Sequence, residues 1–349
     1  MELMNSAQRF HAALDGHVPD RIPIFYQHLG AAKWLLQSTG LRMRDGFFDP
    51  EVFSKLAMAA YERFGFDNVM AGWGDILIEA QAHGMKWKFP ERDFYPRVDQ
   101  YVPMSDLEKV QPLDPCKDPI WSVPIKAAKM MIDHYGSKVP VVGCIDSPTV
   151  IASELVGMEN LLIGYLVDPE AIDHLLITLT ESSKAYGERI IELGVEDVFI
   201  ENGTAGSEMV SQEMYERFDR KYLEMEMGSY HQHGLRTILH NCAASPFWRS
   251  QLEAKPTALH LNLDALNVPE VFNMLKGKTA VMAGINHIDL LFNRTPVEIE
   301  DNIRGAMAAW GNDPGFILAP GCELLYKTPL ENIKALRDCV IRYGTYQTG

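Results

Sequence analysis

The chain has 349 residues, 47% of them hydrophobic and 23% charged, so it can bury a large core and still shape a pocket. Its 47 acidic and 32 basic residues give a formal charge of −15, and no basic run offsets this balance. A nucleic acid or an anionic membrane surface is therefore not an expected partner. Five cysteines do not suggest a disulfide framework, and the sequence shows no signal peptide and no long apolar run. We expect a cytoplasmic protein whose thiolates are free to bind metal.

Short apolar runs alternate with helical patterns along the chain. The predicted strands are residues 22–26, 68–71, 139–144, 198–200, 237–240, 258–261, 280–283 and 316–318. Because these runs are continuous and separated by helices, they predict a parallel sheet that is covered on both faces. About eight such units predict one closed (β/α)₈ TIM barrel that spans residues 1–349. A doubly wound open sheet is the alternative, although no glycine-rich dinucleotide turn follows any strand.

Four helices are predicted with clear boundaries: residues 169–193, 211–233, 297–310 and 330–343. Ser211 is a typical N-cap, and Pro296 and Pro329 open the last two helices. Residues 81–125 break the alternation, because this segment is rich in proline, aspartate and aromatic residues. We expect it to form an excursion or cap over one end of the barrel.

Two predicted strand ends carry residue types that bind metal. His240 ends one strand and Cys242 follows it, so the two side chains can point to the same side. Cys322 follows the last strand after a Pro-Gly turn, and the carboxyl ends of barrel strands share one face. One imidazole and two thiolates suit zinc and leave a fourth position open. The alternative is that each cysteine is simply a small buried apolar residue, and the pattern alone leaves both interpretations open.

Two segments then carry a resemblance to a known family: Ile238-Leu239-His240-Asn241-Cys242, and Ile317-Leu318-Ala319-Pro320-Gly321-Cys322, which leads to Thr328-Pro329-Leu330-Glu331-Asn332. Residues 143–149 and 197–218 support it. Over nearly its whole length the chain resembles the uroporphyrinogen decarboxylase superfamily, in particular its zinc-dependent corrinoid methyltransferase branch. The resemblance implies the barrel, and the methylcobamide:coenzyme M methyltransferases imply His240, Cys242 and Cys322 as zinc ligands.

The chain also departs from these relatives. Uroporphyrinogen decarboxylases bind the carboxylates of their substrate with an Arg-Gln-Ala-Gly-Arg segment, where this chain has Tyr26-Gln27-His28-Leu29-Gly30. Decarboxylation of that substrate is therefore not expected. Asp75 lies in a stretch similar to the Ser-Asp-Ile segment of the decarboxylases. Coenzyme M enzymes usually show Asp-Pro-x-Ala-Ser and a glycine after the zinc cysteine, where this chain has Glu201-Asn202-Gly203-Thr204-Ala205 and Ala243.

Polar and aromatic residues near the predicted strand ends are candidates for the rest of the site. Glu201 could be a fourth zinc ligand or a proton donor, and a solvated loop carboxylate is the alternative. The substrate-binding candidates are Tyr26, His28, Trp73, Asp75, Glu79, Asn202, Asn262 and Asn286. The aromatic side chains that could wall a flat pocket are Phe25, Tyr26, Trp34, Trp73, Trp87 and Phe89, although the favoured alternative is that most of them are core or cap residues.

We expect a zinc-containing methyltransferase of the O-demethylase type. It would pass methyl from a methoxylated, aromatic donor to the Co(I) corrinoid of a separate corrinoid-binding protein. The aromatic-rich front half and the departures from the coenzyme M pattern motivate this expectation. The alternative is methyl transfer from a methylcorrinoid to a thiol or another acceptor. A non-catalytic corrinoid carrier is less favoured, because the sequence lacks the Asp-x-His-x-x-Gly loop of such carriers.

Overall fold

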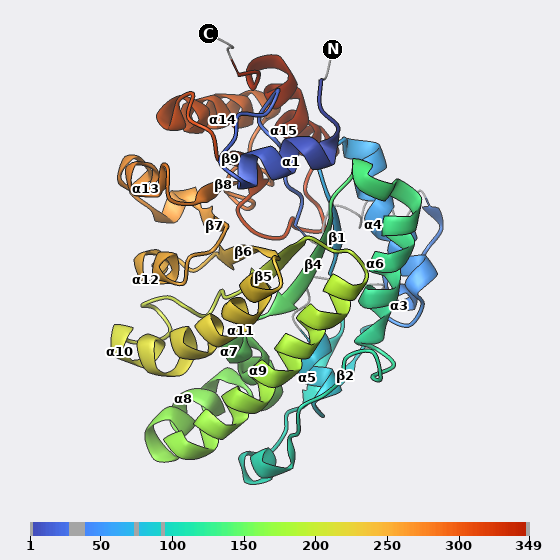
Figure 1. The fold of residues 1–349 in the computed structure, drawn as a ribbon, viewed down its shortest axis with the longest axis vertical. Helices are drawn as coiled ribbons and strands as arrows, with labels where there is room; N and C mark the ends of the chain where they lie inside the picture. Colours follow the sequence, from blue (N-terminus) through green and yellow to red (C-terminus); the bar gives the residue numbers. More distant parts are fainter. Residues whose placement is uncertain (1–2, 28–38, 73–76, 92–94, 347–349) are drawn as a thin grey trace.

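The centre of the fold is a parallel sheet that curls on itself, with helices over its outer face (Figure 1). The computed structural model describes residues 3–27, 39–72, 77–91 and 95–346. Within them the sheet order is β1-β4-β5-β6-β7-β8-β9, and all neighbours are parallel. The strands are Val69–Ala71 (β1), Val141–Asp146 (β4), Asp197–Glu201 (β5), Arg236–Asn241 (β6), Ala258–Asn262 (β7), Ala280–Ile285 (β8) and Phe316–Pro320 (β9).

Side chains along each strand alternate between two hydrophobic clusters. Phe199 and Ile238 belong to a small inner cluster, whereas their neighbours Ile200 and Leu239 join the large cluster under the helices. Strand residues two apart share a face, so both faces of each strand are buried. This is why the strands appear in the sequence as continuous apolar runs.

The strand register brings the carboxyl ends of the strands together at one edge of the sheet. Glu201 at the end of β5 pairs with His240 of β6, and Ile285 of β8 pairs with Pro320 of β9. Gly284 allows β8 to pack closely there, because an added Cβ would lie 2.6 Å from the Cα of Gly321. The turn that carries Cys322 is thereby held against the sheet.

The prediction of a closed eight-stranded ladder is wrong in detail. Residues 22–26 lie between β9 and β1, but they form only one bridge to β9, from Ile24 to Leu318. Pro23 has no N–H to donate, although its carbonyl accepts from the N–H of Leu318. On the other side the amide side chain of Asn68 bonds both the N–H and the carbonyl of Tyr26. The segment therefore fills the gap between the edge strands without extending the ladder.

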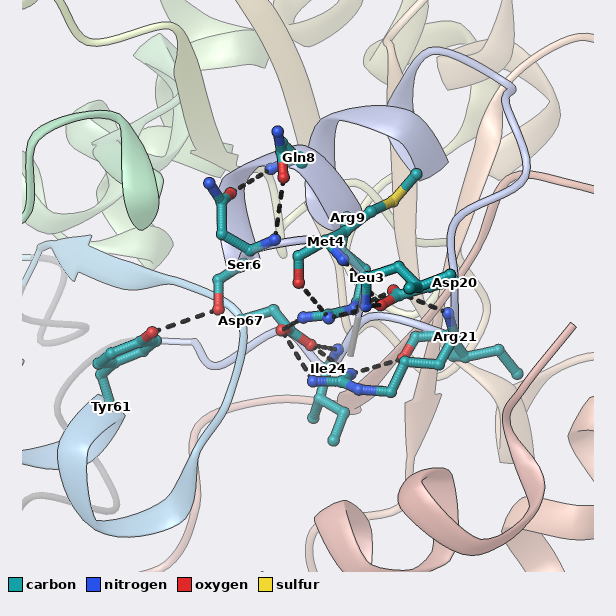
Figure 2. A network of polar contacts seen from close by, with 12 residues as sticks. Leu3, Met4, Ser6, Gln8, Arg9, Asp20, Arg21, Ile24, Tyr61 and Asp67 are labelled. Atoms are coloured by element: carbon teal, nitrogen blue, oxygen red, sulfur yellow. Dashed lines mark hydrogen bonds and ion pairs between the residues drawn. The ribbon is translucent and has the colours of Figure 1, made fainter. Parts of the chain in front are cut away.

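A buried ion network ties this closing segment to the N-terminal helix α1 (Ser6–Leu14). Figure 2 shows the carboxylate of Asp67 between the guanidinium groups of Arg9 and Arg21. The N–H of Ile24 also donates to Asp67, at 2.9 Å, and Asp20 accepts from Arg9 at 2.6 Å. Since both arginines and Asp67 are buried, these bonds offset the cost of removing the charges from water.

The helices largely follow the predicted boundaries. Their bounds are α1 (above), Met43–Gly46 (α3), Pro50–Phe64 (α4), Ile78–Ala82 (α5), Ser122–Tyr135 (α6), Pro148–Val156 (α7), Met158–Val167 (α8), Pro169–Glu192 (α9), Gln212–Tyr215 (α10), Lys221–Gln232 (α11), Trp248–Glu253 (α12), Val268–Leu275 (α13), Pro296–Trp310 (α14) and Leu330–Tyr343 (α15). Ser211 caps α10 through the N–H of Met214, and Thr295 and Glu298 form a capping box on α14. Pro329 is the N-cap of α15, one position before the predicted first turn.

Two features were not predicted. The single helix expected over residues 211–233 contains a π-helical stretch, Glu216–Arg220, between α10 and α11. The segment 81–125 holds an antiparallel hairpin of β2 (Lys86–Lys88) and β3 (Arg97–Gln100), followed by the 3₁₀ helix Met104–Lys109. Short 3₁₀ turns also lie at Gly136–Lys138 and Leu263–Ala265.

None of the described helices is by itself long and apolar enough to cross a membrane. The pair α7 and α8 meets that criterion only when the two are counted together, and they are bent by 106° where they join. Most of α7 is buried inside the protein, as expected for a core helix.

Candidate metal centre

Three potential metal ligands meet at the carboxyl edge of the sheet. His240 belongs to β6, Cys242 follows it, and Cys322 lies just beyond β9. One ligand atom from each residue lies within 4.8 Å of the other two. Ligand atoms around a tetrahedral zinc ion are roughly 3.4–3.8 Å apart, given bonds of about 2.0 Å to nitrogen and 2.3 Å to sulfur. The structure thus brings together the three predicted ligands in a cluster of suitable size.

A chain of hydrogen bonds fixes the tautomer of His240. His260 Nε2 lies 2.8 Å from the carbonyl of Pro320, which can only accept, so this nitrogen carries the proton. His260 Nδ1 is then an acceptor, and His240 Nδ1 donates to it at 2.8 Å. His240 Nε2 is fully buried, makes no hydrogen bond of ordinary geometry, and lies near the acidic groups of Glu201 and Cys242, which raise the pKa of His240 against the effect of burial. A buried nitrogen in this state is costly unless it binds something, and a metal ion satisfies it.

The two thiols differ in their protonation. The Cys322 thiol donates a hydrogen bond to Cys242, and this bond, with nearby His240, lowers the pKa of Cys242 to about 4. The same contact raises the pKa of Cys322 well above its usual value, and burial adds to this. Cys242 is therefore a ready thiolate ligand. The second thiolate needs a cation beside it, which a zinc ion held by His240, Cys242 and Cys322 would supply.

Glu201 stands next to this cluster at the end of β5. Its Oε2 lies 3.5 Å from His240 Nε2, and its Oε1 accepts a hydrogen bond from Gln27 Nε2 at 3.2 Å. Glu201 is not part of the cluster whose ligand atoms are all within 4.8 Å. Glu201 is 7% exposed, so it is not the solvated loop carboxylate of the alternative interpretation.

A buried polar network supports the strand ends from behind. Asn202 donates to both carboxylate oxygens of Asp219 and to Ser147, and it accepts from Gln251. Gln251 in turn accepts from Asn241, the residue between the two ligands of β6. Asp219 belongs to the π-helical stretch, and burial raises its pKa to about 7. The network thus links the end of β5 to the end of β6.

A cavity of about 500 Å³ adjoins the metal cluster. Cys242, Cys322, Glu201 and Gln27 form its inner wall. The outer wall includes Val150, Met158 and Met209 and the ring of Tyr101, together with two further carboxylates, Glu154 and Glu323. Tyr101 comes from the segment 81–125, so this excursion contributes directly to the site. Among the described lining residues there is no lysine, arginine or histidine.

Several predicted substrate-binding residues lie elsewhere among the described residues. Tyr26 and Asn202 occupy positions whose side chains point outward, away from the inner cluster. Tyr26 therefore stacks on Phe66, and Asn202 joins the polar network. Glu79 is buried on α5, where burial and the charge of Glu201 raise its pKa to about 7. None of these three lines the cavity.

The remaining candidates are divided between the strand ends and the undescribed segments. Asn262 caps the turn after β7, and Asn286 bonds Asp264 at 2.7 Å. His28, Trp73, Asp75 and Trp34 lie outside the described residues. Phe25 stacks on Phe199 in the inner core, and Trp87 and Phe89 pack on Phe47. The only aromatic ring of the described cavity wall is that of Tyr101, so the predicted aromatic wall is not formed by these residues.

Sequence reasoning missed Gln27, Glu154 and His260. The predicted site contains Tyr26 and His28 but not Gln27. Strand alternation from the inner residue Phe25 nevertheless indicates that the side chain of Gln27 points inward. His260 lies in a predicted strand two residues after the inner residue Ala258, so the same parity signal was present. Glu154 lies on a helix, and no local pattern separates it from a surface carboxylate.

An imidazole and two thiols beside a cavity, at the carboxyl edge of a curled parallel sheet, define a barrel-like protein with a candidate metal site. The chain belongs to the uroporphyrinogen decarboxylase family: the model of the family described as "Uroporphyrinogen decarboxylase (URO-D)" matches residues 5–343.

Curated relatives span nearly the whole chain. A methylcobamide:CoM methyltransferase, MtbA, of Methanosarcina acetivorans is 22% identical over 96% of this chain and 97% of its own. The MtaA protein of Methanosarcina barkeri, with the same description, is 25% identical over 94% and 95%. A uroporphyrinogen decarboxylase of Koribacter versatilis is 22% identical over 95% and 94%. A solved methyltransferase from Methanosarcina mazei has the same fold, with a TM-score of 0.87, 22% identity and coverage of 97% and 99%.

Proposed function

We propose that this chain is a corrinoid-dependent methyltransferase that holds zinc on His240, Cys242 and Cys322. It moves methyl from a methoxylated donor to the Co(I) corrinoid of a partner protein. Relatives described as methylcobamide:CoM methyltransferases support the corrinoid chemistry. The observation that carries the direction of transfer is Glu201, whose carboxylate lies 3.5 Å from the unpartnered nitrogen of His240 inside the cavity.

Zinc bound here would act as a Lewis acid on the heteroatom that bears the methyl group. The protein's own residues hold that heteroatom beside a proton source. His260 keeps the proton of His240 on Nδ1, so Nε2 stays available as a ligand. Cys242 and Cys322 line the cavity directly, so a molecule bound there would be next to a zinc ion held by them.

In the proposed step the methyl–oxygen bond of the donor breaks and its electron pair stays on the oxygen. Glu201, held by Gln27 and entering the step as the protonated carboxylic acid, delivers its proton to that oxygen; the demethylated product leaves as an alcohol or phenol and Glu201 is left as the carboxylate. The new bond to the methyl carbon uses the electron pair of Co(I) on the partner's corrinoid. A methyl ether is a poor leaving group, so stabilising charge on its oxygen is the main task of the site.

The direct test incubates the purified protein with Co(I) cobalamin and a panel of methoxylated compounds, aromatic and aliphatic. We expect methylcobalamin to form with at least one methoxylated donor, followed by its visible spectrum. Glu201→Gln is expected to lower the rate by about 10²–10⁴-fold, the usual contribution of a positioned proton donor. Glu188, an exposed carboxylate on α9 away from the cavity, provides the matched control as Glu188→Gln.

A second candidate is methyl transfer from a methylcorrinoid to a thiol. The descriptions of the methylcobamide:CoM relatives favour it. The discriminating assay supplies methylcobalamin and thiols and measures demethylation. Activity here, with none in the Co(I) assay, would replace the proposed direction by this one.

A further inference from the structure

The cavity beside the metal centre contains polar groups that the protein leaves unsatisfied. Glu154 projects from α7, is half-buried, and makes no hydrogen bond or ion pair with any residue that the structure describes. Gln27 is 2% exposed, and while its Nε2 donates to Glu201, its buried Oε1 has no partner. Both groups are acceptors, and an acceptor removed from water without a donor is unfavourable.

The acidic side chains of the cavity wall also favour a ligand that supplies hydrogen-bond donors and positive charge. Glu201 and Glu323 add two carboxyl groups, while the described lining contains no basic side chain. Glu323 also accepts a hydrogen bond from the Tyr95 hydroxyl. Burial raises the pKa of Glu154 to about 7, which reflects the missing counter-charge. A cation bound beside Glu154 would relieve the desolvation cost of this half-buried carboxylate.

We propose that the cavity takes a substrate that carries an ammonium group, with the charged nitrogen bound by Glu154 and the Oε1 of Gln27. The heteroatom that gives or accepts methyl then lies at the His240, Cys242 and Cys322 centre. An ammonium group has N–H donors and no acceptor, so it matches two unpartnered acceptors. The proposal rests on the proposed function for the metal centre, and it holds for either direction of methyl transfer.

Thiols of matched length test the charge preference, because a thiolate binds the metal whether or not methyl is transferred. The protein is loaded with Co²⁺, a spectroscopic substitute for zinc, and titrated with ω-aminothiols, ω-hydroxythiols and ω-sulfonated thiols of two to six carbons. The thiolate-to-cobalt absorption band gives each Kd. At the best length we expect the aminothiol to bind about tenfold more tightly than the hydroxythiol, and the sulfonated thiol to bind most weakly.

Two glutamine variants assign the preference to one carboxylate. Glu154→Gln is expected to bring the ratio of aminothiol to hydroxythiol affinity close to one. Glu159→Gln removes an exposed carboxylate at the start of α8, outside the cavity wall, and is expected to keep the wild-type ratio. The Co²⁺ spectrum of each variant reports whether its metal centre is folded.

The outcomes separate the inference from the proposed function. Equal affinities, tighter binding of the sulfonated thiol, no thiol-induced band at any length, or an unchanged ratio in Glu154→Gln would overturn the ammonium preference. Failure to bind Co²⁺ at all, or absence of methyl transfer in both cobalamin assays, would instead overturn the proposed function. The wild-type series gives its answer even if Glu154→Gln does not fold.

Discussion

At the scale of the single residue, His260 decides which nitrogen of His240 is available to a metal ion. Its two nitrogens connect the carbonyl of Pro320 to His240 Nδ1. The turn that carries Cys322 and the strand that carries His240 are therefore joined through one imidazole. Such an outer partner orients a ligand without touching the metal.

His260→Phe is expected to lower zinc affinity by about 10–100-fold, since it removes the acceptor for His240 Nδ1 while keeping a ring of similar shape. The measurement is competition with a chelator of known affinity. His260→Gln, which retains an acceptor and a donor, should recover part of the loss. Unchanged affinity in His260→Phe would show that His260 only packs against Phe25 and Phe199.

Cys322→Ala is expected to abolish stoichiometric zinc binding, because it leaves two of the three protein ligands. Elemental analysis of the purified protein measures the metal content. Cys339→Ala serves as the control, since Cys339 is also buried but lies on α15. Full zinc retention in Cys322→Ala would contradict the ligand set.

At the scale of the helix, α9 and α11 are joined by a carboxyl group that the fold keeps protonated. The Tyr230 hydroxyl lies 2.8 Å from the carbonyl of Ser183 and 2.9 Å from Glu226 Oε1. The hydroxyl donates toward both oxygens, so it holds the Glu226 carboxyl group against α9. Burial raises the pKa of Glu226 to about 8, and the hydrogen bond from Tyr230 offsets only part of this rise.

The raised pKa of Glu226 makes stability depend on pH. Below about pH 4.5 the group is protonated in both states; between there and about pH 8 only the folded state keeps the proton, so stability falls as pH rises. The loss is at most about 1.4 kcal/mol per pH unit. Glu226→Gln, whose amide can donate to Tyr230, removes this titrating group. Its free energy of unfolding, measured with urea, should therefore change less between pH 5.5 and pH 8.5 than that of the wild type. Glu188→Gln, at an exposed position, is the control and should keep the wild-type pH dependence. Equal pH dependence of the free energy of unfolding in wild type and Glu226→Gln would refute a raised pKa of Glu226.

At the scale of the whole molecule, the sheet is completed by side chains as much as by backbone. Residues 22–26 bond β9 through the backbone, while Asn68 and Asp67 hold the other side. Arg9 and Arg21 then connect this junction to α1. The N-terminal part of the chain therefore holds the barrel together next to the strand end that carries Gln27.

Asp67→Ala is expected to lower the free energy of unfolding by about 3–5 kcal/mol, because it removes a carboxylate shared by two buried guanidinium groups. Chemical denaturation measures the change. The comparison is Asp45→Ala, which breaks an exposed pair with Arg42 and should cost about 1 kcal/mol or less. A similar small cost for both variants would mean that the buried network is not what holds this junction.

The sequence by itself determined the parallel sheet and most strand and helix boundaries, and it pointed to the three candidate metal ligands that the structure brings together. Continuous apolar runs, capping residues and the spacing of His240 and Cys242 are local signals, and β/α alternation places strand ends on one edge. The residues that shape the chemistry around them were not determined in this way. Gln27, Glu154 and His260 act through partners distant in the sequence, and the eighth strand position depends on whether Asn68 and Asp67 reach across to it. Only tertiary structure decides such contacts, because side-chain parity and the packing of separate elements determine which polar groups meet and which are left unpartnered.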